Sequence, residues 1–446
     1  MAFEGRISID DRVEAVKMPE NVRIGLMVDE HRKRCGSDGC QFDYSGFAFG
    51  QSPFSVPPTL SNALADSVEN GQYSSSTGVY ELREAIAKFS KRYFDLHIEP
   101  ESVVVGHGTK GLFFVIFSMI QGGVVIPSPS WVSYVPQLEI LGKDYHILHT
   151  DPYNDYKVMP DELESFLAGL ERNQHLLILN SPNNPTGAVY SRRELERIAE
   201  VCREHNILVL SDEIYALTTF EEGSFTSMYG IFPEGTFATN GLAKSFSAGG
   251  YRIGYSLLPQ SFTEEITNNF KKLAATVYTN VSTPTQYAAA TAFRPHEEMD
   301  SYFRVTREIH RIMGIQLSAM FNRIEGLRAT CPKGGFYFFV DFNGVKDKLI
   351  ANGVATSNDL MQDMIKHPHH IALISGDSCL LRPDDFGARI AYVDYDGDAA
   401  MKAYQEERPR TPGEEYDFFL RLAPKMVDGV ERVRTYLDGL KGKDGE

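Results

Sequence analysis

Long apolar segments are missing from this 446-residue sequence. The most apolar run, GLFFVIFSMI at 111–120, is about half as long as a membrane-spanning helix. The first residues, MAFEGRISIDDR, lack the apolar run of a secretory signal. We therefore expect no membrane association and a cytoplasmic location.

Cysteine pairs and basic clusters are also scarce. The five cysteines are odd in number, and the closest two, Cys35 and Cys40, have four residues between them, which is not the CxxC spacing of a metal or redox site. The formal charge is −16, from 44 basic and 60 acidic residues, and HRKR at 31–34 is the one basic cluster. Such a charge repels phosphate backbones. We expect reduced thiols, no metal and no nucleic-acid partner.

Apolar β-rich runs alternate with helical patterns through the first two thirds of the chain. The hydrophobic share of 42% is enough for a sizeable core and two domains. Alternation of strand and helix is typical of a mostly parallel sheet with helices on both faces, an α/β fold. The predicted strands are 102–106, 123–128, 175–180 and 207–213; the predicted helices are 80–93, 110–120 and 191–206, the last with a capping box of Ser191 and Glu194.

The pattern changes near residue 297 to one long helical stretch followed by strand-like runs. These runs are GGFYFFVDF, HIALIS and ARIAYVDYD, and a closing helix is predicted over 414–437. The polar segment 396–415 has two prolines and is predicted to be a surface insertion. We predict a large domain over 50–296 and a smaller α+β domain formed by 297–446 with the N-terminal segment 1–49.

The sequence GHGTKG at 106–111 matches the G-x-G-x-x-G fingerprint of dinucleotide-binding proteins. That fingerprint also needs an acidic residue about 20 positions further on, and the region IPSPSWVSY has none. This argues against a nicotinamide dehydrogenase. Two readings remain: backbone N–H groups at Gly108 and Thr109 bind a phosphate at a helix N-terminus, or the stretch is a tight turn without a ligand.

Polar residues follow the ends of two predicted strands, in LILNSPNNPTG and LVLSDEIY. Ligands of open parallel sheets bind beyond the carboxyl ends of the strands, so Asn184, Asp212 and Tyr215 are expected near one crevice. Taken singly, each has a structural explanation: a turn for Asn184, a helix cap for Asp212 and a core aromatic for Tyr215.

The segment TNGLAKSFSAGGYRIGY at 239–255 contains two charged residues, Lys244 and Arg252, among small and apolar side chains. We expect both to be buried against an anionic or carbonyl ligand. A poorly solvated lysine can attack an aldehyde, and an arginine offers a planar fork to a phosphate. With Asp212 on a ring nitrogen, Asn184 and Tyr215 on a phenolic oxygen and Trp131 stacked on the ring, the ligand that fits is pyridoxal 5'-phosphate.

Three motifs, NSPNNPTG, SDEIY and GLAKSFSAGGYRIG, resemble those of fold-type I pyridoxal-phosphate enzymes, and in particular the class I/II aminotransferases. The resemblance extends from about FGQSPFSVP at residue 49 to ARIAYVD near 394. It implies a homodimer. It also implies that Lys244 forms a Schiff base with the cofactor, that Asp212 pairs with the ring nitrogen, and that Asn184 and Tyr215 bind the ring oxygen while Trp131 covers the ring. The residues implied around the phosphate are Gly108, Thr109, Lys110, Arg252 and the partner's Tyr73. Those implied to bind the substrate carboxylate are Arg389, Gly50 and Asn184.

The implied reaction moves an amino group from an L-amino acid to a 2-oxo acid, with Lys244 as the base that takes the Cα proton. Some positions depart from the family pattern. Gly241 stands where many relatives have a phosphate-binding serine, with Ser245 or Ser247 as replacements, and Arg382 is a second arginine near Arg389. AATVYTNVSTPTQ lacks the arginine that one acidic-substrate subgroup uses, which leaves Lys110 as a substitute contact.

Other functions remain open at this point. A lyase, decarboxylase or cyclising synthase of the same fold would share every cofactor residue, and product analysis without an oxo-acid acceptor would identify it. A cofactor-binding transcription regulator would need an added DNA-binding domain and a basic surface, neither of which this acidic sequence contains.

Overall fold

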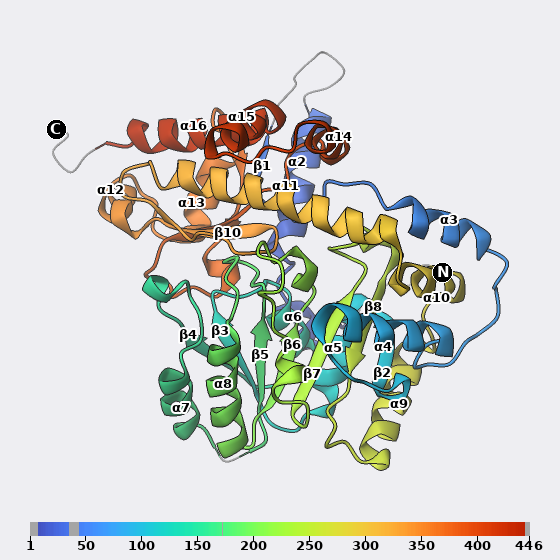
Figure 1. The fold of residues 1–446 in the computed structure, drawn as a ribbon. Coiled ribbons are helices and arrows are strands. Elements are labelled where there is room, and N and C mark those ends of the chain that lie inside the picture. The colour runs from blue at the N-terminus through green and yellow to red at the C-terminus, as the bar shows by residue number, and fades with distance from the viewer. Residues whose placement is uncertain (1–7, 35–43, 172, 442–446) are drawn as a thin grey trace, which may run out of the picture.

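The computed structural model describes residues 8–34, 44–171 and 173–441, and its centre is a seven-stranded sheet (Figure 1). The strand order is β2-β8-β7-β6-β5-β3-β4, and all strands run parallel except β8, which is antiparallel to both of its neighbours. The bounds are β2 Val103–His107, β3 Val124–Ser128, β4 Tyr145–His149, β5 Leu176–Asn180, β6 Leu208–Asp212, β7 Thr236–Gly241 and β8 Ile253–Leu257. The predicted α/β class is confirmed.

Helices cover both faces of this sheet. Successive strand residues point to opposite faces, and since the residues on both faces are apolar, each face packs against helices. On β5, Leu176 and Ile178 pack with α5 and α6, whereas Leu177 and Leu179 pack with α7 and α8 on the other side. The predicted capping box begins α8, where Ser191 and Glu194 bond reciprocally. The bounds are α3 Pro58–Asp66, α4 Tyr80–Phe94, α5 Gly108–Met119, α6 Tyr134–Leu141, α7 Pro160–Ala168, α8 Arg192–Glu204, α9 Glu264–Tyr278 and α10 Thr283–Phe293.

A second, four-stranded sheet lies above the first in Figure 1 and is antiparallel, in the order β12-β13-β10-β9. The long helix α11 packs against its strand β10 and against α14 and α15. The bounds are β9 Arg328–Ala329, β10 Tyr337–Asp341, β12 Ile374–Ser375, β13 Gly387–Ala391, α11 Glu297–Phe321, α12 Lys346–Ala351, α13 Ser357–Met364, α14 Gly397–Glu407, α15 Pro412–Leu422 and α16 Pro424–Gly439.

Near the N-terminus, α1 Asp11–Ala15 and α2 Glu20–Arg34 precede a short strand, β1 Ser45–Gly46. This strand pairs with β11 Ile371–Ala372. The segment 44–48 therefore packs beside residues more than 300 positions away. This pairing holds in place the segment that precedes Gly50. The division into domains at 49/50 and 296/297 stays a prediction. In the sequence, the strands of the seven-stranded sheet all precede residue 297 and those of the four-stranded sheet all follow it.

Three sequence predictions for the C-terminal third were wrong in detail. The closing helix is two helices, α15 and α16, because Pro424 cannot continue the first and instead begins the second. The predicted surface insertion contains α14, whose Gly397, Ala400 and Ala403 are buried. HIALIS is divided between β11 and β12, which belong to different sheets.

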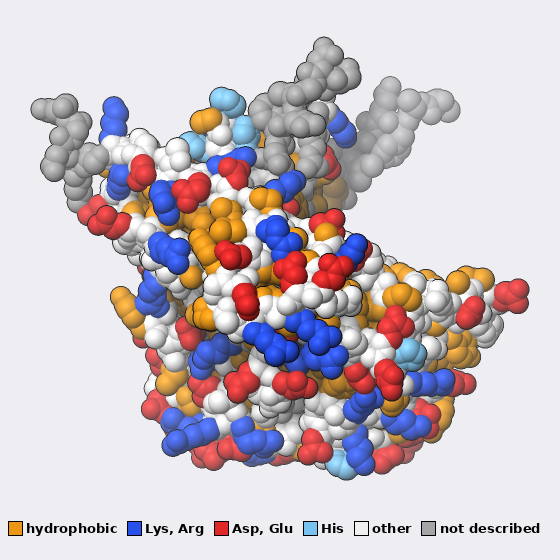
Figure 2. Space-filling model, turned by 45° about the horizontal axis from the view of Figure 1, so that its top comes forward, with side chains coloured by type: hydrophobic (Ala, Val, Ile, Leu, Met, Phe, Trp, Pro, Cys, Tyr) orange, Lys and Arg blue, Asp and Glu red, His pale blue; other side chains and the backbone are white. Residues whose placement is uncertain are grey.

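Charged side chains of both signs intermingle on the face shown in Figure 2. Within the part of the chain that the structure describes, no helix is both long enough and apolar enough to cross a membrane. Cys202 and Cys379 are buried free thiols and Cys331 is an exposed one, while Cys35 and Cys40 lie outside the described residues.

Candidate active site

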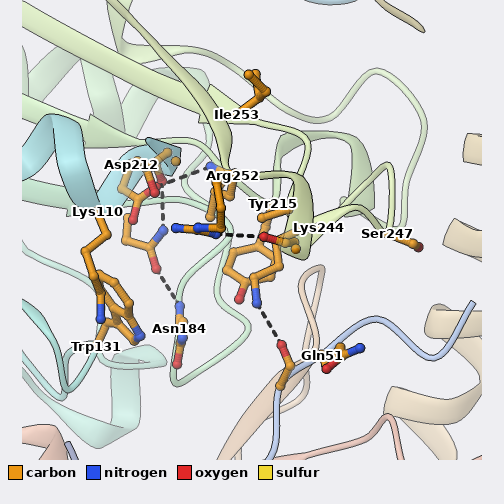
Figure 3. A pocket seen from close by; sticks show the side chains of 18 residues that line it. Gln51, Lys110, Trp131, Asn184, Asp212, Tyr215, Lys244, Ser247, Arg252 and Ile253 are labelled. Atoms are coloured by element: carbon orange, nitrogen blue, oxygen red, sulfur yellow. Dashed lines mark hydrogen bonds between the residues drawn. The ribbon is translucent and has the colours of Figure 1, made fainter. Parts of the chain in front are cut away.

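A pocket of about 510 Å³ lies beyond the carboxyl ends of β5, β6 and β7, where the fold predicts a ligand. Figure 3 shows its side chains converging from the large sheet, the start of α5 and the segment at Gln51. The lining includes these residues predicted from the sequence: Gly50, Gly108, Thr109, Lys110, Trp131, Asn184, Asp212, Tyr215, Lys244, Ser247 and Arg252. The described residues contain no group of three or more His, Cys, Asp or Glu suited to a metal ion.

Asp212 ends β6 and presents a buried carboxyl group to the pocket. Its side chain accepts a hydrogen bond from Tyr134 Oη at 2.7 Å and one from the Ile214 amide at 3.4 Å. Burial raises the pKa of Asp212 to about 6, and these hydrogen bonds and the charge of Lys244 offset the burial only in part. The site therefore holds a carboxylate that lacks a full positive partner.

Lys244 follows β7 and is half-buried between two aromatic rings. Its Nζ donates to the backbone oxygen of Gly50 at 2.7 Å (Figure 3) and lies 5.4 Å from the ring centre of Tyr215 and 5.6 Å from that of Phe336. A cation over aromatic faces is held electrostatically while its nitrogen stays accessible from the pocket. The ammonium group is thus positioned by one carbonyl and two rings.

Arg252 is exposed at the edge of the pocket, so the expectation that both cations are buried was wrong for this residue. Its backbone has φ of 56°, and its guanidinium group donates to the carbonyls of Gly249 at 2.7 Å and His107 at 3.4 Å. This places it beside the first turn of α5. A Cβ on Gly108 would lie 2.6 Å from Arg252 Nη2 where that side chain now stands, and the φ of +67° favours glycine at this position.

The N-terminus of α5 supplies the other side of this anion-binding end. The Gly108 amide is not available to a ligand, because it donates to the Arg252 carbonyl at 3.0 Å. The following amides belong to the first helical turn, whose N–H groups have no intrahelical acceptors. Thr109 and Arg252 thus remain suited to a phosphate, whereas Gly108 contributes by its lack of a side chain.

Gly241 cannot be replaced by serine without movement of the backbone. A Cβ at this position would lie 2.5 Å from the Ile253 carbonyl oxygen and 2.8 Å from Gly254 Cα. Ser245 is buried and does not line the pocket, and the hydroxyl of Ser247 lies 2.5 Å from that of Ser52 and accepts from Tyr302 Oη at 2.6 Å. Ser247 lines the pocket and Ser245 does not, so the contribution of Ser247 to a phosphate site stays a prediction.

Trp131 and Lys110 form the wall opposite Lys244. Lys110 Nζ lies 5.1 Å from the ring centre of Trp131 and donates to Ser133 Oγ at 3.2 Å. Burial, together with the charge of Arg252, lowers the pKa of Lys110. An anion near Lys110 would therefore relieve the repulsion from Arg252.

Arg389 on β13 comes from the small sheet and lies behind Asn184, outside the pocket lining. Its Nη2 donates to the Ala48 carbonyl at 2.7 Å and its Nη1 to Asn184 Oδ1 at 3.3 Å, while its buried Nε has no hydrogen-bond partner. A buried guanidinium N–H without an acceptor is costly. This unpaired donor is consistent with a site for a carboxylate.

Two of the predicted positions lie away from the pocket. Tyr73 is 87% exposed and lies outside the pocket lining, and Arg389 lies behind Asn184, also outside it; the alternative arginine, Arg382, is absent from the lining as well. Sequence reasoning missed Asn180, which lines the pocket, and two tyrosines, Tyr134 beside Asp212 and Tyr337 beside Tyr215. Asn180 could have been found as the last residue of its strand; the two tyrosines carry no local signal.

Comparison with known proteins identifies the family. The family model described as aminotransferase class I and II matches residues 43–394. The chain belongs to the class I and II aminotransferases. It is 31% identical over 343 residues to the aspartate aminotransferase of Bacillus sp. strain YM-2 and 28% identical over the same length to the asparagine–oxo-acid transaminase of Streptococcus mutans. Both alignments cover 75% of this chain and 84% of the relative.

The fold also matches a solved structure of an aspartate aminotransferase from Thermus thermophilus with maleate. The TM-score is 0.78 at 24% identity, covering 96% of this chain and all of the other. The predicted enzyme class is therefore confirmed: this aminotransferase moves an amino group between an amino acid and a 2-oxo acid.

Proposed function

We propose that this aminotransferase works with pyridoxal 5'-phosphate joined to Lys244. The observation that supports the proposal is the convergence, in one pocket, of a lysine amine, a buried carboxyl group at Asp212 and an anion-binding end at Arg252 and α5. These are the partners that an aldehyde, a ring nitrogen and a phosphate need.

The residues present fit this cofactor. The raised pKa of Asp212 indicates a carboxylate that a protonated ring nitrogen would stabilise. Trp131 and Tyr215 offer a ring face and a hydroxyl on the pocket wall. The glycine at 108, where a Cβ would touch Arg252, leaves room for an anion close to the backbone.

When bound, the cofactor supplies a carbonyl carbon for an amine and a ring that accepts the electron pair from the substrate Cα. Asp212 keeps the proton on the ring nitrogen, and Tyr215 and Asn184 donate to the ring oxygen. Lys244 Nζ, freed by the incoming amine, takes the Cα proton and releases it on the same face of the pocket. The Phe336 ring, whose centre is 5.6 Å from Lys244 Nζ, makes the surroundings of this amine apolar.

The substrate α-carboxylate is assigned to Arg389, whose unpaired Nε and fork geometry suit a two-point contact. Gly50 closes over it from the segment held by Ala48. For a second carboxylate, as in aspartate, Lys110 is the candidate contact, supported by its place on the pocket wall. A cytoplasmic location and the absence of a nucleic-acid partner stay predictions.

The experiment that tests the cofactor assignment is borohydride reduction followed by peptide mapping. We expect the pyridoxyl group on Lys244 and a loss of label in Lys244→Ala. Lys110→Ala is a matched control, because it removes another partly buried lysine of the same pocket. A label on Lys110, or none on the loaded protein, would overturn the assignment.

We also propose a homodimer in which Tyr73 reaches the phosphate of the neighbouring chain. The support is the resemblance to the family, together with a Tyr73 side chain that is 87% exposed and so accessible to a second chain. Its hydroxyl would add a donor to a phosphate already held by Arg252, so that cofactor retention depends on association.

Subunit exchange tests the dimer. A Tyr73→Phe chain is mixed with a Lys244→Ala chain, so that a heterodimer has one site with both changes and one with neither. Activity above that of either parent is expected if Tyr73 acts across the interface. Exchange without recovery, despite a measurable defect in the Tyr73 variant, would mean that Tyr73 acts within its own chain.

A further inference from the structure

Tyr337 is a buried tyrosine at the start of β10 that lies behind Lys244 and outside the pocket lining. Its hydroxyl lies 3.2 Å from Tyr215 Oη and 3.4 Å from the Gly50 carbonyl oxygen, the same oxygen that accepts from Lys244. Its ring centre lies 4.4 Å from the guanidinium carbon of Arg389. Tyr337 thus contacts Tyr215, Arg389 and the carbonyl oxygen that accepts from Lys244.

The two phenols of this cluster are in opposite electrostatic situations. Burial and the neighbouring hydroxyl raise the pKa of Tyr215 well above its usual value. Burial also acts to raise the pKa of Tyr337, but the charges of Lys244 and Arg389 and the hydrogen bonds from Tyr215 and Lys244 outweigh it, and that pKa is lowered. Tyr215 is therefore the donor of the pair and Tyr337 the acceptor.

The space for this hydroxyl depends on Gly50. A Cβ on Gly50 would lie 1.6 Å from Tyr337 Oη, far inside contact distance. The close approach of the Gly50 backbone to Lys244 and the presence of the Tyr337 hydroxyl are thus parts of one packing arrangement.

We propose that Tyr337 is a positioning residue that holds the proton of Lys244 Nζ and fixes the orientation of the Tyr215 hydroxyl by accepting its hydrogen bond. It acts through Lys244 and Tyr215 and does not touch the ligand. An electron-rich phenol oxygen beside an ammonium group stabilises the protonated amine. Removal of this oxygen leaves the ammonium with the Gly50 carbonyl and two aromatic rings, so Lys244 gives up its proton at lower pH.

The inference rests on the proposed role of Lys244, and its test separates the two. In the cofactor-free protein, the rate at which an acylating reagent modifies Lys244 is followed against pH by peptide mass spectrometry. We expect Tyr337→Phe to lower the midpoint of this curve by about one pH unit, a tenfold loss of proton affinity. Circular dichroism confirms the fold of each variant.

Two further variants distinguish proton control from a packing role. Tyr229→Phe removes another buried phenol, one that donates to the Leu258 carbonyl at 3.1 Å, and should leave the midpoint unchanged. Tyr215→Phe removes the donor to Tyr337 and should leave the midpoint in place or raise it. Opposite behaviour of two phenols 3.2 Å apart is not expected from lost packing.

In the loaded enzyme, the absorbance of the bound cofactor is titrated in the same set of variants, and its midpoint should fall in Tyr337→Phe alone. An unshifted Lys244 curve in that variant, or equal shifts in the Tyr229 or Tyr215 variant, would overturn the proposal. A protein that binds no cofactor would refute the proposed function instead, while the modification curves of the cofactor-free protein would still decide the role of Tyr337.

Discussion

The two sides of the pocket are built in different ways. One side, here called the sheet wall, consists of Asn184, Asp212, Lys244 and Arg252, which follow strands of the seven-stranded sheet or precede one. On the other side Gly50 lines the pocket, and the residues packed behind it and behind Asn184 are Ala48, Phe336, Tyr337 and Arg389; this group from three distant parts of the chain is here called the assembled wall. The sheet wall offers charged and polar groups to a cofactor; the assembled wall positions the lysine and a carboxylate.

The comparison shows that buried carboxyl groups with raised pKa values lie in or beside the sheet wall. Asp212 is a buried carboxyl group whose pKa is about 6, and Glu213 next to it is buried with a pKa of about 7 for the same reason, burial. In the assembled wall, the carbonyls of Ala48 and Gly50 already accept hydrogen bonds from Arg389 and Lys244. We therefore expect changes to the sheet wall to alter catalysis and stability, and changes at Arg389 in the assembled wall to alter substrate binding.

The largest effect is expected from Asp212→Ala. Loss of the carboxylate removes the group that keeps the ring nitrogen protonated, so turnover should fall by about 10³-fold while the cofactor stays bound. Single-turnover kinetics and the cofactor spectrum measure the two quantities. Near-normal turnover would show that the sheet wall does not act as an electrostatic partner.

The next effect concerns stability and pH. Because the pKa of Asp212 is raised on folding, the folded protein binds more protons than the unfolded chain between pH about 4 and about 6. Its contribution therefore lowers the free energy of unfolding as pH rises through that range, by about 3 kcal/mol in total. Asp212→Asn should remove this dependence from the cofactor-free protein.

Urea unfolding of the two chains at several pH values measures the difference, in which Glu213 is common to both. Asp417→Asn, an exposed carboxyl group on α15, is the control and should behave like the parent. A parent and an Asp212→Asn chain with parallel stability curves would contradict the prediction.

The smallest effect is expected in the assembled wall, from Arg389→Lys. A lysine keeps the charge but loses the two-point contact and the bond to Asn184, so kcat/KM should fall by about 30-fold, mainly through KM. Steady-state kinetics with a panel of amino acids measures this. Arg382→Lys is the control and should have little effect, because the bond to the lining residue Asn184 comes from Arg389; the reverse result would exchange the roles of the two arginines.

The same division explains how far the sequence could predict this protein. The alternation of strands and helices, the capping box at Ser191 and the residues of the sheet wall follow from contiguous motifs, since a residue at the end of a parallel strand has one possible edge to occupy. Local rules do not reach Tyr337, which becomes part of the site only when β10 packs beside Gly50. The exposure of Arg252 was missed because small neighbours indicate close backbone approach as readily as burial.

In the C-terminal third, the errors have a similar physical origin. The segment 396–415 is polar enough to be taken for an insertion, yet three small residues on one side of α14 are buried, which the polar majority conceals. HIALIS has the composition of one strand, and its division between two sheets depends on pairing with Ser45 and Arg389, both distant in sequence.

The antiparallel direction of β8 has a consequence for how this enzyme can vary. The chain leaves β7 and enters β8 at the same end of the sheet. Residues 242–252 therefore form a loop whose two ends are held by adjacent strands. If β8 were parallel to β7, the chain would have to cross to the other end of the strands before entering β8, which would separate Lys244 from Arg252. The spacing between amine and guanidinium is thus set by the length of a single loop, and insertions there should be far less tolerated than insertions elsewhere on the surface.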